Sequence, residues 1–136
     1  MMTMDEMKKF IGNKGKPSVF EIDRTMIKRY CEAIGDPSPK WHDVTPPGLL
    51  AAAMLMGEGA QMPPFPYPGI VDAGGEWEYF KPIKAGDMIT VVNEFTGVED
   101  KSNEKRKMLL FSMKSTFTNQ RGEVVAAAGG RVMNLG

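Results

Sequence analysis

The chain contains few of the residues that build several common kinds of site. Its 136 residues include one cysteine, Cys31, and one histidine, His42. A single cysteine excludes an internal disulfide framework and a cysteine-rich zinc site, and it is compatible with a reducing compartment. Because only one imidazole exists to activate a thiol, we interpret Cys31 as a buried helix residue rather than a nucleophile. We expect neither a metal nor another cofactor.

The sequence also lacks an excess of charge of one sign and a long hydrophobic run. Its 17 basic residues balance 17 acidic ones, so no overall field favours nucleic acid. The first ten residues, MMTMDEMKKF, are charged throughout and contain no apolar core of signal-peptide length. The main apolar stretch is too short to cross a bilayer and is bounded by prolines. We therefore expect a cytoplasmic protein that binds neither nucleic acid nor membrane.

That apolar stretch, TPPGLLAAAMLMGEGAQM at residues 45–62, is the element around which the rest of the chain is organised. It carries a single charge, Glu58. Pro46 and Pro47 suit the first turn of a helix, where a missing N–H is tolerated, and the prolines that follow the stretch would end it. A helix that is apolar on every side has to be buried all round. The sequence therefore predicts a long central helix over about 48–61.

The remaining segments predict a sheet that covers this helix. At its length the chain fits one domain, 1–136, in which residues 1–16 form an arm. Residues 18–22 are a short extended segment, and an amphipathic helix follows the cap Asp23 and ends at Gly35. Four strands joined by short turns follow, at 69–80, 87–98, 106–118 and 123–134. An antiparallel sheet wrapped around one helix is an α+β arrangement of the hot-dog type.

Four runs of sequence resemble the MaoC-like hydratase/dehydratase family, in particular its branch of FAS1-like dehydratase amino-terminal domains. They are FEIDRTMIKRYCEAIGDPSP, PPGLL, GGEWEYFKPIKAGD and TNQRGEVVAAAGGRVMN, and the resemblance extends over the chain from about residue 10. It implies a hot-dog dimer in which two sheets join. It also implies that an acyl thioester of CoA or acyl-carrier protein lies in a tunnel near the dimer interface, where water is added to or removed from the adjacent double bond.

Catalytic members of that family carry an Asp-x-Asn-Pro-x-His motif, whose aspartate and histidine hold a water and move its protons. Here the corresponding turn reads DPSPKWH, beginning at Asp36. Trp41 occupies the histidine's position, and His42 lies one residue late. One residue displaces a side chain by about 3 to 4 Å and usually reverses its direction in an extended segment. The resemblance makes Asp36 and His42 the candidate catalytic residues, with this departure in spacing.

Three further residues are candidates for substrate binding. Trp41, on a proline-rich loop beside a helix start, could line the acyl tunnel or serve only in packing. Gly48 could expose its N–H to the thioester carbonyl, because free amides at a buried helix start suit developing negative charge; otherwise it serves packing. Asp72 is either a solvated charge or a polar group that reaches the thioester.

Three hypotheses about function follow. In the first, the chain is the acyl-binding, non-catalytic half of a heteromeric enoyl-CoA hydratase or dehydratase, and its partner carries the catalytic pair. In the second, a homo-oligomer uses its own Asp36 and His42. In the third, the chain is a hot-dog acyl-CoA thioesterase, with Glu58 as the candidate carboxylate of the central helix, or a non-catalytic acyl-CoA-binding subunit. The expected assembly is a homodimer, or a heterodimer or heterotetramer with a second hot-dog chain.

Overall fold

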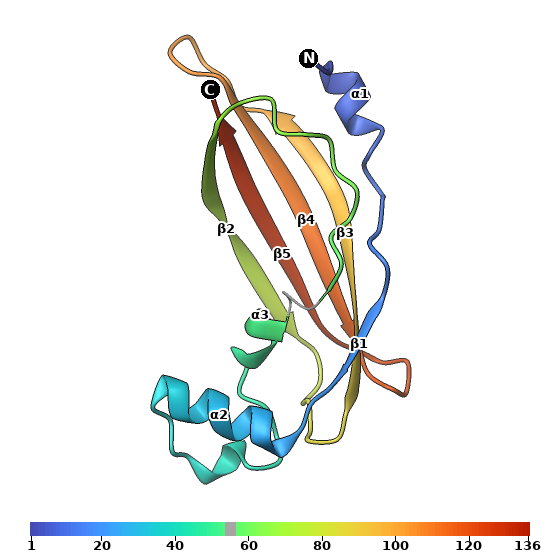
Figure 1. Ribbon diagram of the computed structural model, residues 1–136, viewed down its shortest axis with the longest axis vertical. Helices are drawn as coiled ribbons and strands as arrows, with labels where there is room; N and C mark the ends of the chain where they lie inside the picture. The colour runs from blue at the N-terminus through green and yellow to red at the C-terminus, as the bar shows by residue number, and fades with distance from the viewer. Residues whose placement is uncertain (54–56) are drawn as a thin grey trace.

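The computed structural model describes residues 1–53 and 57–136 and shows one curved sheet with α2 and α3 at one end and α1 near the other end, beside β3 (Figure 1). The elements are α1 (Met4–Lys8), β1 (Ser18–Glu21), α2 (Arg24–Ile34), the 3₁₀ turn η1 (Pro39–Trp41), α3 (Leu49–Ala53), β2 (Gly69–Tyr79), β3 (Met88–Asp100), β4 (Met108–Thr118) and β5 (Val124–Leu135). All neighbouring strands are antiparallel, in the order β1-β3-β4-β5-β2. This is the sheet of a hot-dog fold. Every predicted strand is confirmed, with bounds that differ by at most two residues.

The alternation of side chains decides which face of the sheet forms the core. On β4, Leu109, Phe111 and Phe117 point to one face and are buried, with at most 5% of their surface exposed. Residues between them, such as Lys114, lie on the other face. Because successive side chains of a strand point to opposite faces, this period of two was visible in the sequence.

The predicted central helix is confirmed only at its start. Helix α3 covers Leu49–Ala53, residues 54–56 lie outside the described part of the chain, and residues 57–61 have no helical structure. There the Asn93 side chain donates from Nδ2 to the Glu58 carbonyl, 3.0 Å away, so a contact with the sheet replaces a helical hydrogen bond. A Cβ on Gly57 would lie 2.6 Å from the same Nδ2, so only glycine allows this approach.

The expectation that this stretch is buried all round is also wrong for its start. Leu49 and Leu50 are buried against the sheet, with 4% and 1% of their surface exposed, but Ala51 and Ala52 are exposed. The helix is therefore covered on one side only. Small alanine side chains have little apolar area to remove from water, so their exposure costs little.

The amino-terminal arm covers part of one sheet edge. Thr3 and Glu6 form a reciprocal capping box that begins α1, a signal that could have been recognised in the sequence. Met7 on α1 is buried in a cluster with Phe95 and Phe111. The backbone of the arm then continues along β3, where the Gly12 N–H bonds to the Phe95 carbonyl at 2.8 Å. Short strand β1 and the arm together line β3, and β2 forms the opposite edge (Figure 1).

Helix α2 has the ends that the sequence predicts. The Asp23 carboxylate accepts the Met26 N–H at 2.7 Å, and Gly35 ends the helix with φ +71°, a conformation that favours glycine. Ile27 is buried in the core. This helix and the loop after it lie beyond the end of the sheet, beside α3 (Figure 1). Across the described residues, no helix is both long and apolar enough to span a bilayer.

Candidate functional site

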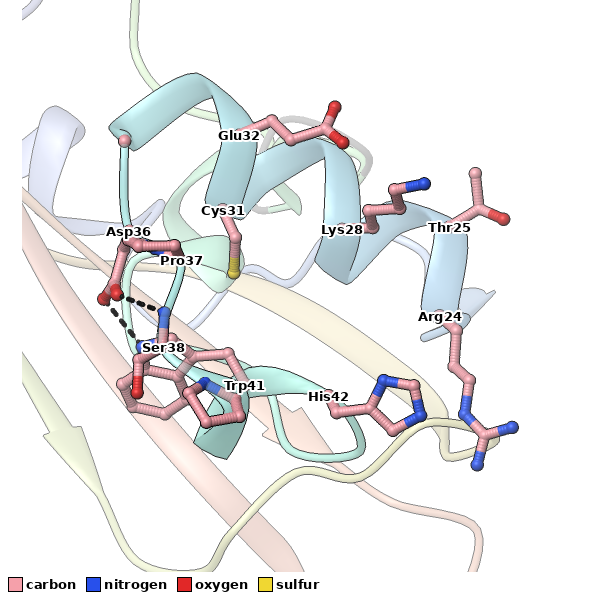
Figure 2. A pocket seen from close by; sticks show the side chains of 12 residues that line it. Arg24, Thr25, Lys28, Cys31, Glu32, Asp36, Pro37, Ser38, Trp41 and His42 are labelled. Carbon is pink, nitrogen blue, oxygen red and sulfur yellow. Dashed lines mark hydrogen bonds between the residues drawn. The ribbon is translucent and has the colours of Figure 1, made fainter.

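A cleft of about 580 Å³ lies between α2 and the loop of residues 35–43 (Figure 2). Lys28 and Cys31 line it from the helix, and Pro37, Trp41 and His42 line it from the loop. Cys31 is half-buried on α2, as expected of a helix residue that packs inward, and its sulfur points toward the loop. The cleft therefore brings Cys31 together with the turn at Asp36 that corresponds to the family's motif.

Asp36 holds the loop in place with both of its carboxylate oxygens. Oδ1 accepts the backbone N–H of Ser38 at 3.0 Å, and Oδ2 accepts the indole N–H of Trp41 at 2.7 Å. These two hydrogen bonds, that of Ser38 first, lower the pKa of Asp36 below its usual range. Asp36 is therefore a firmly ionised carboxylate whose oxygens already have donors from its own loop.

The structure does not bring His42 to Asp36. Its imidazole points away from Asp36 and toward Arg24 (Figure 2), and 71% of its side-chain surface is exposed. The carboxylate near it is that of Asp43, whose Oδ1 lies 4.0 Å from Nε2 of His42. The same Oδ1 accepts two hydrogen bonds from Arg24, at 2.6 and 2.9 Å, which lower the pKa of Asp43.

Trp41 takes the place that the family motif gives to histidine. Its indole N–H donates to Oδ2 of Asp36, so the ring at this position is bonded directly to the carboxylate. An indole N–H is a donor only, with no lone pair available to accept a proton. Trp41 can orient the loop or a ligand, but it cannot take a proton from water and return it to a substrate.

Trp41 also faces a second, smaller hollow of about 230 Å³ at the start of α3. Pro47, Leu50 and Tyr79 line it together with Trp41. The Tyr79 hydroxyl donates to the Pro47 carbonyl at 2.7 Å, and partial burial, with Tyr30 nearby, raises the pKa of Tyr79. The sequence did not single out Tyr79 as a site residue, because no local pattern relates residues 32 positions apart.

Gly48 lies beside the same hollow, against a tyrosine from α2. A Cβ at this position would overlap the Tyr30 hydroxyl, so the close contact requires glycine. The role of the Gly48 amide stays a prediction, and the neighbour that the structure gives to Gly48 is the phenol of Tyr30.

Asp72 and Glu58 are not part of this region. Asp72 lies on β2 opposite Val132, and its Oδ1 accepts the Gly74 N–H at 2.8 Å in an exposed bulge. Tyr79 lies seven positions further along the strand, at most about 24 Å away at about 3.4 Å per residue. Glu58 is exposed and has no helical structure, although the helix predicted over about 48–61 was expected to contain it. Of the three predicted binding residues, only Trp41 and Gly48 lie near each other.

Comparison with known proteins shows the family of this chain. The family model described as "FAS1-like, dehydratase domain region" matches residues 9–128. A UPF0336 protein of Streptomyces avermitilis is 25% identical over 149 residues, which span 97% of this chain and 91% of that protein. Such a match extends along both chains, so the likeness concerns the whole domain.

Two solved structures share the fold. A chain of the ChsH1-ChsH2 complex from Mycobacterium tuberculosis has a TM-score of 0.77 and 21% identity, with 96% of this chain and 88% of that chain covered. The MaoC-like dehydratase from Rhodospirillum rubrum has a TM-score of 0.70 and 21% identity, with 91% of each chain covered. Since the family model spans nearly the whole described sheet and the turn at Asp36, this chain belongs to the FAS1-like dehydratase domain family.

Proposed function

We propose that this chain is the acyl-thioester-binding, non-catalytic half of a heteromeric enoyl-thioester hydratase or 3-hydroxyacyl-thioester dehydratase. A second hot-dog chain supplies the aspartate and histidine that move protons. The observation that carries the proposal is the hydrogen bond from the Trp41 indole to Asp36. It occupies Oδ2 of the Asp36 carboxylate, and the indole has no ring nitrogen that could accept a proton.

Hydration of an enoyl thioester needs a group that takes a proton from water and one that gives a proton to the substrate carbon. General acid and base transfer of this kind contributes about 10²- to 10⁴-fold to a rate. Trp41 cannot supply either step. His42 is exposed and turned toward the Arg24–Asp43 ion pair instead of toward Asp36. The chemistry is therefore assigned to a partner.

The sheet edge supports a partner that is another hot-dog chain. Strand β2 has 11 residues, lies at the end of the strand order, and exposes most of its side chains. The fold relative from Mycobacterium tuberculosis was solved as a complex of ChsH1 with ChsH2. Within this assembly the hollow beside Trp41 and Tyr79, which reaches the β2 edge, is the contribution of this chain to the binding of the acyl thioester of CoA or acyl-carrier protein.

The proposal is tested with purified protein and a short trans-2-enoyl-CoA, by following the loss of the enoyl-thioester absorbance. The chain alone should give no hydration above background. Co-expression with a hot-dog chain that carries an intact Asp-x-Asn-Pro-x-His motif should give a stable, active complex. Replacing the histidine of that motif with alanine should abolish activity, whereas His42→Ala in this chain should leave it unchanged.

Other outcomes distinguish the remaining hypotheses. Robust hydration by this chain alone, lost in His42→Ala, would overturn the proposal in favour of a self-sufficient Asp36/His42 pair. Release of free CoA without hydration of the double bond would indicate a thioesterase. If the two chains form no complex, or if the complex hydrates the substrate no faster than the partner alone, that result would also count against the proposed function.

A further inference from the structure

The two edges of the sheet differ in a way that bears on assembly. Strand β1, at one edge, has four residues, and the amino-terminal arm continues its cover of β3. Strand β2, at the other edge, has 11 residues and no neighbouring strand on its outer side within residues 1–53 and 57–136 (Figure 1). Long bare edges offer a row of unpaired N–H and C=O groups to another chain, and proteins usually cover or shorten them.

Apolar side chains along the β2 edge are exposed at both of its ends. Ile70 and Val71 have 61% and 50% of their surface exposed, and Tyr79 and the adjoining Phe80 have 44% and 53%. Ile70 and Val71 are consecutive strand residues and so point to opposite faces of the sheet. Exposure on both faces at once is what a missing neighbouring strand produces.

The charges on this edge are all of one sign. Gly69–Tyr79 contains Asp72, Glu76 and Glu78 and neither lysine nor arginine. Arg131 of β5 reaches Glu76 with hydrogen bonds of 2.6 and 3.2 Å, so one of the three carboxylates has a partner within its own sheet. The strand that docks on β2 therefore meets a strip of negative charge.

Pairing of β2 with a copy of itself about an axis at Glu76, Trp77 or Glu78, where its ladder with β5 is regular, places these acids against one another. In an antiparallel pair related by a two-fold axis, each residue faces one that is equally far from the axis on the other side. An axis at Trp77 sets Glu76 opposite Glu78 twice, and an axis at Glu76 or Glu78 sets that glutamate opposite its own copy. Like charges directly opposite each other destabilise a strand pair, and opposite charges stabilise it.

We propose that the carboxylates of β2 select, as the second hot-dog chain that pairs with this edge, a chain whose own edge strand carries lysine or arginine over a copy of this chain. The inference rests on the proposed function in taking the partner to be a hot-dog chain. It adds that the charge on the edge strand decides which hot-dog chain is the partner. Backbone hydrogen bonds supply the contact, and charge supplies the choice.

A charge-reversed copy of this chain serves as the probe. The variant Glu76→Lys/Glu78→Lys/Arg131→Glu reverses the edge while keeping an ion pair between positions 76 and 131. Analytical ultracentrifugation should show that wild type and variant each self-associate weakly. Their mixture should form a heterodimer about tenfold tighter than either homodimer. The preference should shrink as salt is added.

The matched control is Glu21→Lys on β1, which changes the net charge by the same amount at the other edge of the sheet. In a mixture of this control with wild type, the heterodimer should be no tighter than either homodimer. The inference is overturned if the control mixture associates as tightly as the charge-reversed one, if the charge-reversed mixture gains no affinity, or if wild type alone forms a tight dimer that salt does not affect.

Two further measures keep this test decisive. If circular dichroism shows that the triple variant is unfolded, Glu78→Gln alone keeps the Glu76–Arg131 pair, and its homodimer should be tighter than that of wild type because a carboxylate of the strip is removed; an unchanged homodimer would overturn the inference. No thioester is present, so association is read separately from hydration. A selective heterodimer would support the inference even if the hydratase assay failed. Hydratase activity without a selective heterodimer would support the proposed function and overturn the inference.

Discussion

Asn134 on β5 should be one of the strongest single determinants of stability in the described chain. It is fully buried, with 0% of its surface exposed. Its Oδ1 accepts the Tyr67 N–H at 3.0 Å, and its Nδ2 donates to the carbonyls of Tyr67 and Gly69, each at 2.8 Å. These bonds fix the point where the long connection enters β2, so they also hold the proposed docking strand in register.

We expect Asn134→Ala to lower the free energy of unfolding by about 3 kcal/mol. Each of the three hydrogen bonds contributes about 1 kcal/mol net, and their loss leaves backbone groups of Tyr67 and Gly69 without their partners. For a domain of this size the loss corresponds to a fall in melting temperature of about 10 °C. Urea unfolding followed by tryptophan fluorescence should show a lower midpoint with an unchanged slope.

The matched control is Asn103→Ala in the hairpin between β3 and β4. The Asn103 side chain accepts the N–H groups of Lys105 and Arg106, at 2.8 and 2.9 Å, but it is exposed, so water can replace it. Its loss should cost less than about 1 kcal/mol. Equal effects of the two substitutions, or a loss of unfolding free energy below about 1 kcal/mol for Asn134→Ala, would refute the reasoning. That reasoning is that burial makes the three hydrogen bonds of Asn134 costly to remove.

Three other predictions address pH, packing and the loop. Hydrogen bonds, that of Lys81 first, lower the pKa of Glu123 from 4.5 to about 2. Because the folded pKa lies below the unfolded one, this carboxylate stabilises the fold above about pH 4.5 and loses that effect as pH falls toward 2. Glu123→Gln should lower the urea midpoint at pH 7 and flatten its decline in acid; parallel declines would contradict this. Gly48→Ala should cost about 1 to 3 kcal/mol by overlap with the Tyr30 hydroxyl, and adding Tyr30→Phe should recover part of it in thermal unfolding; the same melting temperature for single and double variants would argue against that contact. Trp41→Phe removes a donor to Asp36, so the pKa of that carboxyl should rise toward 3.8 in a ¹³C NMR titration, and an unchanged value would show that the indole bond is not formed.

Local sequence patterns determined the sheet, helix α2 and the family. Alternation of apolar and polar residues on β4, the cap at Asp23 and the glycine at Gly35 each act within a few residues, so they could be recognised without coordinates. The turn that begins at Asp36 likewise indicated that a tryptophan stands where the family has histidine. None of these signals depends on how distant parts of the chain meet.

Contacts between distant segments were decided by the tertiary structure alone. The Asn93 side chain bonds to the Glu58 carbonyl, and the backbone of residues 57–61 is irregular although its composition favoured a helix. This tertiary hydrogen bond and the low helix propensity of glycine outweigh the apolar pattern. The meeting of Tyr30 with Gly48, and the direction of His42 away from Asp36, depend on side-chain orientation and packing. Sequence spacing fixes which residues are near along the chain, whereas a site is made of residues that the fold brings near in space.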